Sequence, residues 1–217
     1  MCIRDSSHLV HSAIVAGFVR LFSWNTKIVF TSHTINLEGR AREILIWLFK
    51  CLRSADILFS KEMIKYYNCS NIEFLPNGIG TEDYQMDLPR FEKFTFIAIG
   101  RLRQVKNHII LINAAKKLKE KIGDDFQILI VGKGPEKENL ESAILDNQCQ
   151  DVVKLLGFRK DIVELCNQSH VFVLPSLWEG FPISLLEAGA SGLPVICLLY
   201  TSPSPRDATL SRMPSSA

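Results

Sequence analysis

The chain has 217 residues, a formal net charge of +2 and a hydrophobic content of 47%. This hydrophobic fraction excludes a disordered protein, and the length allows one large domain or two small ones. A net charge so close to zero provides no field that would favour a nucleic-acid partner. The cysteines are scattered, with no Cys-x-x-C pair and no histidine at metal spacing, which indicates reduced cytosolic thiols and argues against a zinc site.

The first third of the chain shows helical and strand patterns in alternation. Apolar periodicity predicts helices over residues 8–21 and 41–53, and strands over Lys27–Thr31 and residues 56–60. The first helical run carries polar side chains and is too short to span a bilayer. It also lacks the small-residue cleavage site of a signal peptide, so it is predicted to be part of the fold.

The second helical stretch mixes apolar and basic side chains. Ile44 and Trp47 share it with Arg42 and Lys50. We interpret this pattern as a helix that packs one face on the core and exposes a basic face to water. An anionic membrane surface is the alternative, which makes peripheral membrane contact a candidate interaction.

The rest of the chain continues the alternation after a linker over residues 83–91. The predicted elements are, in order, a strand at Phe94–Ile99, a helix capped by Asn107, a strand at Phe126–Val131, a helix over 135–147, a strand over 152–156, a helix over 161–166 and a strand at Val171–Leu174. Strands that alternate with helices form parallel sheets, so the chain is predicted to have an α/β fold.

The stretch that follows the last of these strands carries the clearest chemistry. Pro182 suits the first position of a helix because it has no N–H to lose, and Gly192 is expected to end that helix. Glu179 precedes the helix and Glu187 lies inside it. An ionised glutamate accepts two hydrogen bonds from a diol, and the amides at a helix N-terminus bind anions. A nucleotide-sugar would fit this arrangement; a solvated loop glutamate and an ordinary helix glutamate are the alternative.

A second motif places two cations around one loop. Arg101 follows the strand at Phe94–Ile99, and Lys106 precedes the next helix. Two cations at the carboxyl end of a strand are suited to a diphosphate. Taken alone, a pair of surface cations is the simpler interpretation.

Five motifs in a fixed order carry a family resemblance. They are Pro76-Asn77-Gly78-Ile79, Gly100-Arg101-Leu102 with Lys106-Asn107, Gly132-Lys133-Gly134-Pro135, Gly157-Phe158-Arg159-Lys160-Asp161-Ile162, and the stretch from Leu177 to Ile196. Over roughly residues 8–196 the chain closely resembles the retaining glycosyltransferases of family 4, the glycosyl transferases group 1. The resemblance implies the GT-B architecture, in which two Rossmann-like domains with parallel sheets face each other across the active site.

The resemblance also implies roles for individual residues. Arg101 and Lys106 would neutralise the leaving diphosphate, Glu187 would hold the ribose diol, and Glu179 would hold the donor sugar. His33 would line the reaction centre, although a lone histidine at a strand end is more often structural. The donor pocket would be completed by loop residues, namely Gly100, Gly132, Gly134, Gly157, Phe158, Arg159, Gly180, Phe181 and Pro182. No covalent nucleophile, metal or other cofactor is expected.

Resemblance and composition together predict four segments. Residues 1–7 are interpreted as a non-native leader, 8–85 as the C-terminal part of the acceptor-side domain, and 86–196 as a truncated nucleotide-sugar-binding domain. Residues 197–217 are rich in Ser and Pro without periodicity and are interpreted as a non-native, disordered tail. The chain is thus expected to be a fragment that is inactive by itself.

The expected function is a cytoplasmic transferase, with the inner membrane face as an alternative location. It would move a sugar from a nucleotide-diphosphate donor to a hydroxyl of a lipid-linked or polysaccharide acceptor. Two rival interpretations stay open. One is a non-catalytic nucleotide-sugar-binding fragment, and the other is a sugar-nucleotide epimerase with the GT-B fold.

Overall fold

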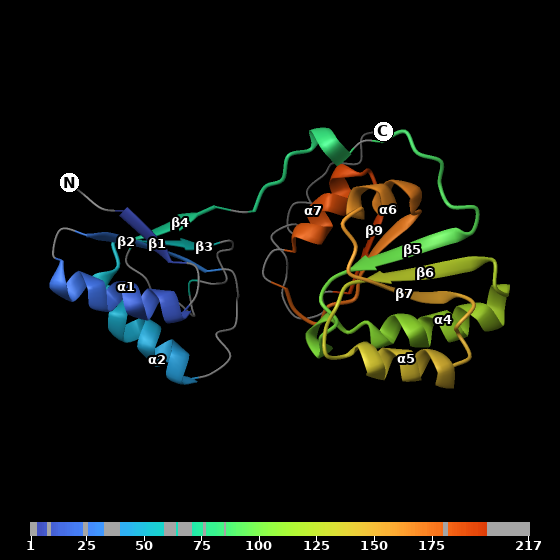
Figure 1. The fold of residues 1–217 in the computed structure, drawn as a ribbon, viewed down its shortest axis with the longest axis horizontal. Helices are drawn as coiled ribbons and strands as arrows, with labels where there is room; N and C mark the ends of the chain where they lie inside the picture. Colours follow the sequence, from blue (N-terminus) through green and yellow to red (C-terminus); the bar gives the residue numbers. More distant parts are fainter. Residues whose placement is uncertain are drawn as a thin grey trace, which may run out of the picture. The chain divides into compact units, whose positions relative to one another are not determined.

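The computed structural model describes residues 4–7, 10–23, 26–32, 40–58, 64, 71–75, 77–84, 86–179 and 182–198. The chain divides into two units, one of residues 1–77 with 179–181 and one of residues 78–178 with 182–217 (Figure 1). Each unit is built on a parallel sheet flanked by helices, which confirms the predicted fold class. The division falls after Asn77, whereas the sequence analysis placed the domain boundary after residue 85.

The first unit has a four-stranded parallel sheet in the order β1-β2-β3-β4. Its elements are β1 (Arg4–Ser7), α1 (Val10–Phe22), β2 (Lys27–Thr31), α2 (Arg40–Leu48), the 3₁₀ turn η1 (Phe49–Leu52), β3 (Ala55–Leu58) and β4 (Ile72–Phe74). Helices α1 and α2 lie together on one face of this sheet (Figure 1). Part of the segment interpreted as a leader therefore pairs with β2 as the strand β1.

The second unit has a five-stranded parallel sheet in the order β7-β6-β5-β8-β9. Its elements are η3 (Glu82–Tyr84), β5 (Phe94–Ile99), η4 (Gln104–Lys106), α4 (Ile109–Ile122), β6 (Phe126–Val131), α5 (Lys137–Asp146), β7 (Val153–Gly157), α6 (Ile162–Gln168), β8 (Val171–Leu174), α7 (Ile183–Ala190) and β9 (Val195–Cys197). Helices α4 and α5 cover one face of the sheet, and α6 and α7 cover the other (Figure 1).

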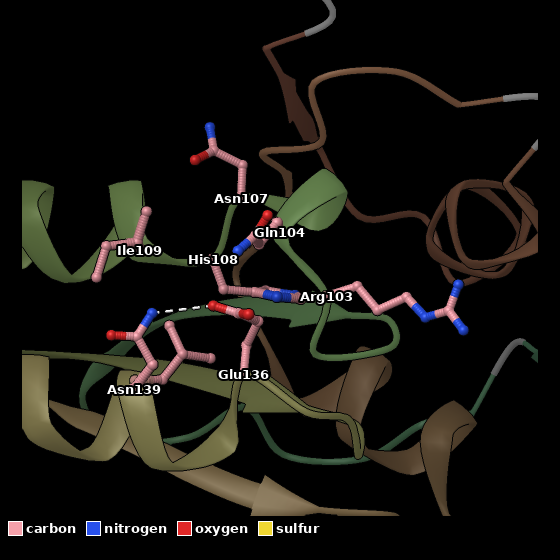
Figure 2. Close-up of a pocket in the computed structure, with 8 residues that line it drawn as sticks. Arg103, Gln104, Asn107, His108, Ile109, Glu136 and Asn139 are labelled. Carbon is pink, nitrogen blue, oxygen red and sulfur yellow. Dashed lines mark hydrogen bonds between the residues drawn. The ribbon is translucent and has the colours of Figure 1, made fainter. Parts of the chain in front are cut away.

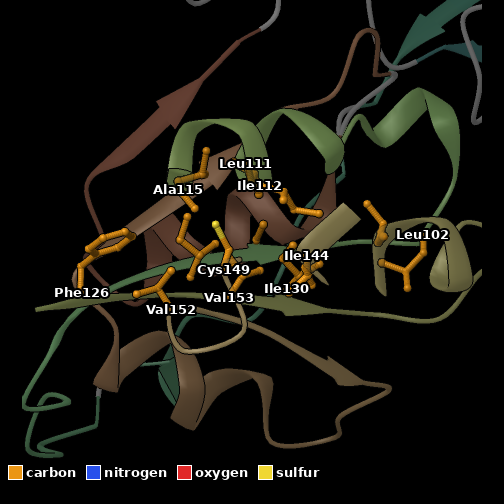
Figure 3. Close-up of a cluster of buried hydrophobic side chains, with 14 residues drawn as sticks. Leu102, Leu111, Ile112, Ala115, Phe126, Ile130, Ile144, Cys149, Val152 and Val153 are labelled. Atoms are coloured by element: carbon orange, nitrogen blue, oxygen red, sulfur yellow. The ribbon is translucent and has the colours of Figure 1, made fainter. Parts of the chain in front are cut away.

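Burial on both faces explains why these strands form. The cluster under α4 and α5, drawn in Figure 3, joins helix residues such as Ile112 and Ile144 to the sheet residues Phe126 and Ile130. A second cluster, under α6 and α7, contains Phe172 of β8 and Ala188 of α7. Strands buried on both faces read as continuous apolar runs, and β5, β6 and β8 accordingly have the bounds predicted from the sequence.

Two predicted helix starts differ from the structure. Asn107 does not cap a helix; it has the left-handed φ of 52° and ends the 3₁₀ turn η4, while His108 is the N-cap of α4. Asparagine tolerates this conformation better than most residues, which suits it to the join between the two helical segments. Pro182 is the N-cap of α7 in an extended conformation, with ψ of 120°, so the helix begins one residue later than predicted.

The loops at the carboxyl edge of the second sheet are joined to one another by their backbones. An N–H group of one loop donates to a carbonyl group at the end of the neighbouring strand or in the neighbouring loop. The pairs and their distances are Gly100 to Val131 (2.9 Å), Leu102 to Lys133 (3.0 Å), Gly132 to Gly157 (2.8 Å) and Leu177 to Val105 (2.9 Å). The loops after β5, β6, β7 and β8 therefore form one connected rim.

Two glycines permit this close approach. A Cβ atom on Gly132 would lie 1.9 Å from the carbonyl oxygen of Gly100, and a Cβ atom on Gly134 would lie 2.2 Å from that of Leu102. Neither contact can be relieved by turning a side chain, because each involves the backbone of the neighbouring loop. The rim therefore requires glycine at both positions.

Gly134→Ala should lower the free energy of unfolding of the second unit by about 2 kcal/mol or more, because the new methyl group must push the two loops apart. The matched control is Gly189→Ala in α7, where a Cβ atom would meet nothing within 4 Å. Alanine is the better helix former there, so the control should be neutral or stabilise by up to about 1 kcal/mol. Urea unfolding of the two variants measures the difference, and equal stabilities would contradict the packing argument.

Candidate functional site

The strand order of the second unit reverses next to β5. The chain runs from β5 to β6 and β7 on one side, and then crosses to β8 and β9 on the other. In open α/β sheets, ligands bind outside the carboxyl ends of the strands at such a reversal. The loops that leave β5 and β8 therefore define the candidate site, and the bond from the Leu177 N–H to the Val105 carbonyl joins them.

The loop after β5 carries both predicted cations. Arg101 is exposed directly after the strand, and Lys106 is half-buried at the end of η4. The methylene groups of Lys106 run alongside Gly100, since a Cβ atom built on that glycine would lie 3.6 Å from its Cδ and Cε atoms. The structure thus brings Gly100, Arg101 and Lys106 together at the end of one strand.

Glu187 lies in the middle of α7, where burial raises the pKa of its carboxyl group. The Tyr84 hydroxyl donates a hydrogen bond to its Oε1 atom at 3.4 Å, which lowers that pKa in part. A half-buried carboxylate with few partners has lone pairs available for a ligand. Glu187 is also the one carboxylate in α7, Ile183–Ala190.

The structure does not test every residue predicted for this site. Glu179 groups with the first unit, whereas Glu187 belongs to the second. His33, Gly180 and Phe181 lie outside the described residues. The roles predicted for these four positions therefore stay predictions.

The loops after β6 and β7 supply further predicted residues. Phe158 is 62% exposed, and the Nζ atom of Lys133 lies 5.7 Å from the centroid of its ring. A cation at this distance is attracted to the face of an aromatic ring. The Nε atom of Arg159 donates to Asp161 at 2.8 Å, and this hydrogen bond holds the pKa of Asp161 below its ordinary value. Arg159 is thus engaged within its own loop, so its charge is not the part most available to a ligand.

A pocket of about 270 Å³ opens elsewhere in the second unit, at the N-terminal ends of α4 and α5. It is lined by Arg103, Gln104, Asn107, His108, Ile109, Glu136, Asn139 and Leu140 (Figure 2). The Asn139 amide donates to Glu136 at 2.9 Å, and the side chain of Arg103 extends away from the other labelled residues. None of the predicted site residues lines this pocket.

His108 is the feature of that pocket which the sequence analysis missed. It is 4% exposed, and burial together with the charge of Lys106 lowers its pKa to about 4. The imidazole is therefore neutral at physiological pH, so it adds no charge next to the cation pair. The only sequence signal for a buried histidine here was its position between the Lys106-Asn107 pair and an apolar helix.

Within the described ranges, no group of three or more His, Cys, Asp or Glu side chains is arranged to hold a metal ion. The helices found in those ranges are also too short or too polar to cross a bilayer.

The model of a family described as glycosyl transferases group 1 matches residues 82–205, which is more than half of the chain. A UDP-Gal:alpha-D-GlcNAc-diphosphoundecaprenol alpha-1,3-galactosyltransferase of Escherichia coli is 34% identical over 197 residues, covering 78% of this chain and 50% of that protein. An N-acetylgalactosamine-N,N'-diacetylbacillosaminyl-diphospho-undecaprenol 4-alpha-N-acetylgalactosaminyltransferase of Campylobacter jejuni is 27% identical over 208 residues, covering 87% of this chain and 55% of that protein. The chain thus spans about half the length of these relatives.

Solved structures agree on the fold. The Anabaena protein HepE in complex with UDP and glucose superposes with a TM-score of 0.78 at 19% identity, over 89% of this chain and 59% of that one. The pneumococcal O-GlcNAc transferase GtfA in complex with UDP and GlcNAc gives a TM-score of 0.71 at 21% identity, over 83% of this chain and 39% of that one. These likenesses confirm the GT-B-type fold expected from the sequence. With the family match, they show that the chain belongs to the glycosyl transferases group 1.

Proposed function

We propose that the protein to which this chain belongs is a retaining glycosyltransferase that uses a nucleotide-diphosphate-sugar donor. The observation that carries this proposal is the loop after β5, which places Arg101 and Lys106 at the strand-order reversal of the unit that also contains Glu187. Cations at this position suit a diphosphate, and a carboxylate on the adjacent helix suits a ribose diol. The E. coli relative is named for a UDP-galactose donor, which supports the same donor class here.

In the proposed reaction, the bond between the anomeric carbon of the sugar and the diphosphate oxygen breaks. A new bond forms between that carbon and the acceptor oxygen on the same face, and the acceptor's proton passes to the leaving diphosphate. Arg101 and Lys106 stabilise the negative charge that builds on the leaving group. The family resemblance assigns no side chain as a covalent nucleophile. We further propose that the fixed cations make a metal ion unnecessary.

The remaining predicted residues complete the proposed site. Glu179, with the amides of Gly180 and Phe181, would hold the donor sugar, and His33 would line the reaction centre. The loops with Phe158 and Lys133 would border the base. The acceptor is proposed to be a lipid-linked or polysaccharide hydroxyl, because both the E. coli and the C. jejuni relatives are named for diphosphoundecaprenol substrates.

Replacement of Lys106 tests the diphosphate assignment. Lys106→Ala in the whole protein should lower kcat by roughly tenfold or more, because the developing charge of the leaving group loses a fixed cation. Transfer to an acceptor, measured with the donor in excess, gives this rate. The matched control is Lys116→Ala, which removes an exposed lysine on α4 away from the loop after β5. A near-normal rate for Lys106→Ala would remove this residue from the mechanism.

Replacement of the half-buried Glu187 carboxylate should have opposite effects on protein stability and on donor binding. Burial raises the pKa of Glu187, so its ionised form opposes folding above the ordinary pKa of glutamate, and this cost disappears as the pH falls. Glu187→Gln should therefore raise the melting temperature of the ligand-free protein at neutral pH, while it weakens donor binding. Thermal unfolding and calorimetric titration with a nucleotide-sugar measure the two effects. A glutamine variant that is less stable but unchanged in donor binding would contradict the ribose assignment and indicate that Glu187 has a structural role.

We also propose that the first unit contacts an anionic membrane through α1 and α2, which would place the enzyme at the cytoplasmic face. Ile44, Trp47 and Leu48 are each more than half exposed on one face of α2. On α1, Phe18 and Phe22 are 53% and 90% exposed. Exposed apolar stripes on neighbouring helices suit the boundary between headgroups and acyl chains.

A matched pair of leucines tests this contact. Leu48 on α2 is 58% exposed, and Leu145 on α5 of the second unit is 59% exposed. Leu48→Ser in the whole protein should weaken binding to vesicles of anionic phospholipid roughly fivefold, since one buried leucine contributes on the order of 1 kcal/mol. Leu145→Ser should leave it unchanged in the same sedimentation assay. Equal losses, or no vesicle binding by the unaltered protein, would overturn the proposal.

A further inference from the structure

Among the described residues, Tyr84 hydrogen-bonds the carboxylate proposed to hold the ribose, and it does so from a distant part of the sequence. It lies in η3, at the start of the second unit, and its hydroxyl donates to Oε1 of Glu187 at 3.4 Å. Burial, followed by the nearby charge of Glu187, raises the pKa of Tyr84, so the phenol stays protonated and remains a donor. Oε2 of Glu187 has no hydrogen-bond partner among the described residues. The tyrosine thus occupies one oxygen of the carboxylate and leaves the other open.

The backbone of Tyr84 is fixed to the end of α6 by one asparagine. The Nδ2 atom of Asn167 donates to the Tyr84 carbonyl at 2.9 Å and to the Val163 carbonyl at 2.8 Å. Its Oδ1 atom accepts the N–H of Met86 at 3.2 Å. Two of these bonds hold η3 and Met86 against the helix, and the bond to Val163 fixes the asparagine on α6 itself, so the tyrosine reaches Glu187 from an anchored position.

A second set of bonds continues this attachment further along the linker. The Arg90 guanidinium donates to the Ser169 carbonyl at 2.8 Å, and the N–H of Phe91 donates to the Gln168 carbonyl at 2.9 Å. Neither bond involves Glu187. The linker would therefore stay attached to α6 without the tyrosine hydroxyl, which makes the hydroxyl unnecessary for holding the linker in place.

From this geometry we propose that Tyr84 is a positioning residue for donor binding, which holds Oε1 of Glu187 so that Oε2 faces the ribose diol. The proposal rests on the function proposed above for Glu187. A diol needs a carboxylate in one defined rotamer, and a neutral phenol can fix that rotamer without neutralising the charge that attracts the hydroxyls. The bond is long for an O–H···O contact, so it orients the carboxylate without saturating it.

Removal of the Tyr84 hydroxyl should produce a measurable change in the titration of Glu187, because of the groups that surround this carboxylate. Among the described residues, the titratable groups on the elements packed around α7 are Glu82, Asp83 and Tyr84 of η3, Glu164 and Cys166 of α6, and Cys197 of β9. Burial, followed by the charge of Glu187, raises the pKa of Cys166 to about 12, so this thiol is neutral. Tyr84 is the group whose hydrogen bond lowers the pKa of Glu187. Removing the hydroxyl should therefore raise that pKa further.

Tyr84→Phe in the whole protein tests the proposal, because phenylalanine keeps the ring and removes only the hydroxyl. The KM for the nucleotide-sugar donor should rise roughly threefold to tenfold, as expected for losing one hydrogen bond that is longer than usual, while kcat changes by less than about twofold. Donor affinity should fall as Glu187 becomes protonated in acid, and this fall should begin at a higher pH in Tyr84→Phe than in the unaltered protein. An unchanged KM with an unchanged pH profile would overturn the proposal, and tighter donor binding would show that the hydroxyl competes with the diol.

Two further variants separate the possible failures. Arg90→Met removes a bond between the linker and α6 without touching Glu187, and it should leave the pH profile unmoved. The same shift in Arg90→Met as in Tyr84→Phe would assign the effect to the linker and overturn the role of the hydroxyl. Glu187→Gln tests the underlying function. If it leaves donor binding intact, the ribose assignment fails; if it weakens binding while Tyr84→Phe has no effect, only the tyrosine proposal fails.

Discussion

The backbone contact between the loops after β5 and β6 is the constraint on which the candidate site depends. Carbonyl groups of Gly100 and Leu102 lie where side chains of Gly132 and Gly134 would otherwise be, and the N–H of Leu102 donates to the Lys133 carbonyl. This contact determines the path of the chain between β5 and η4. The cations Arg101 and Lys106 are carried on that path, so backbone packing contributes directly to their placement.

The sheet beneath gives this rim a rigid base. Two buried clusters, one on each face, hold the central strand β5 between β6 and β8. The reversal of strand order at β5 brings loops from different parts of the sequence together above the same strand ends. The bond between the Leu177 N–H and the Val105 carbonyl ties the two sides of the reversal. The diphosphate site proposed at this edge thus depends on topology, with the cations carried on one loop.

The sequence predicts some parts of this structure well because of burial. Strands β5 and β6 are apolar on both faces, so their bounds can be read from continuous runs of apolar residues. Strand β1 has the sequence Arg-Asp-Ser-Ser, and only its pairing with β2 makes it a strand, so no local pattern could reveal it. The turn η4 and the left-handed Asn107 were missed because a short 3₁₀ segment leaves no periodic signal. The residues proposed for the diphosphate and the ribose were found from family motifs, whereas the contact between Tyr84 and Glu187 joins residues 103 positions apart and has no signature in the sequence.

The environment of Glu187 reconciles two requirements that conflict in a binding carboxylate. Partial burial strengthens hydrogen bonds to a ligand, because the local dielectric is lower, but it also favours the protonated form, which donates and no longer accepts at both oxygens. A basic partner would keep the group ionised, yet a guanidinium would occupy both oxygens and leave neither for a diol. A neutral phenol at 3.4 Å opposes protonation through one oxygen and leaves the other available. That phenol comes from η3 and not from α7. The hydrogen bond to Glu187 therefore depends on the attachment of the start of the second unit to α6 through Asn167. The segment that leads into the second unit is therefore a functional part of the proposed donor site as well as a connection.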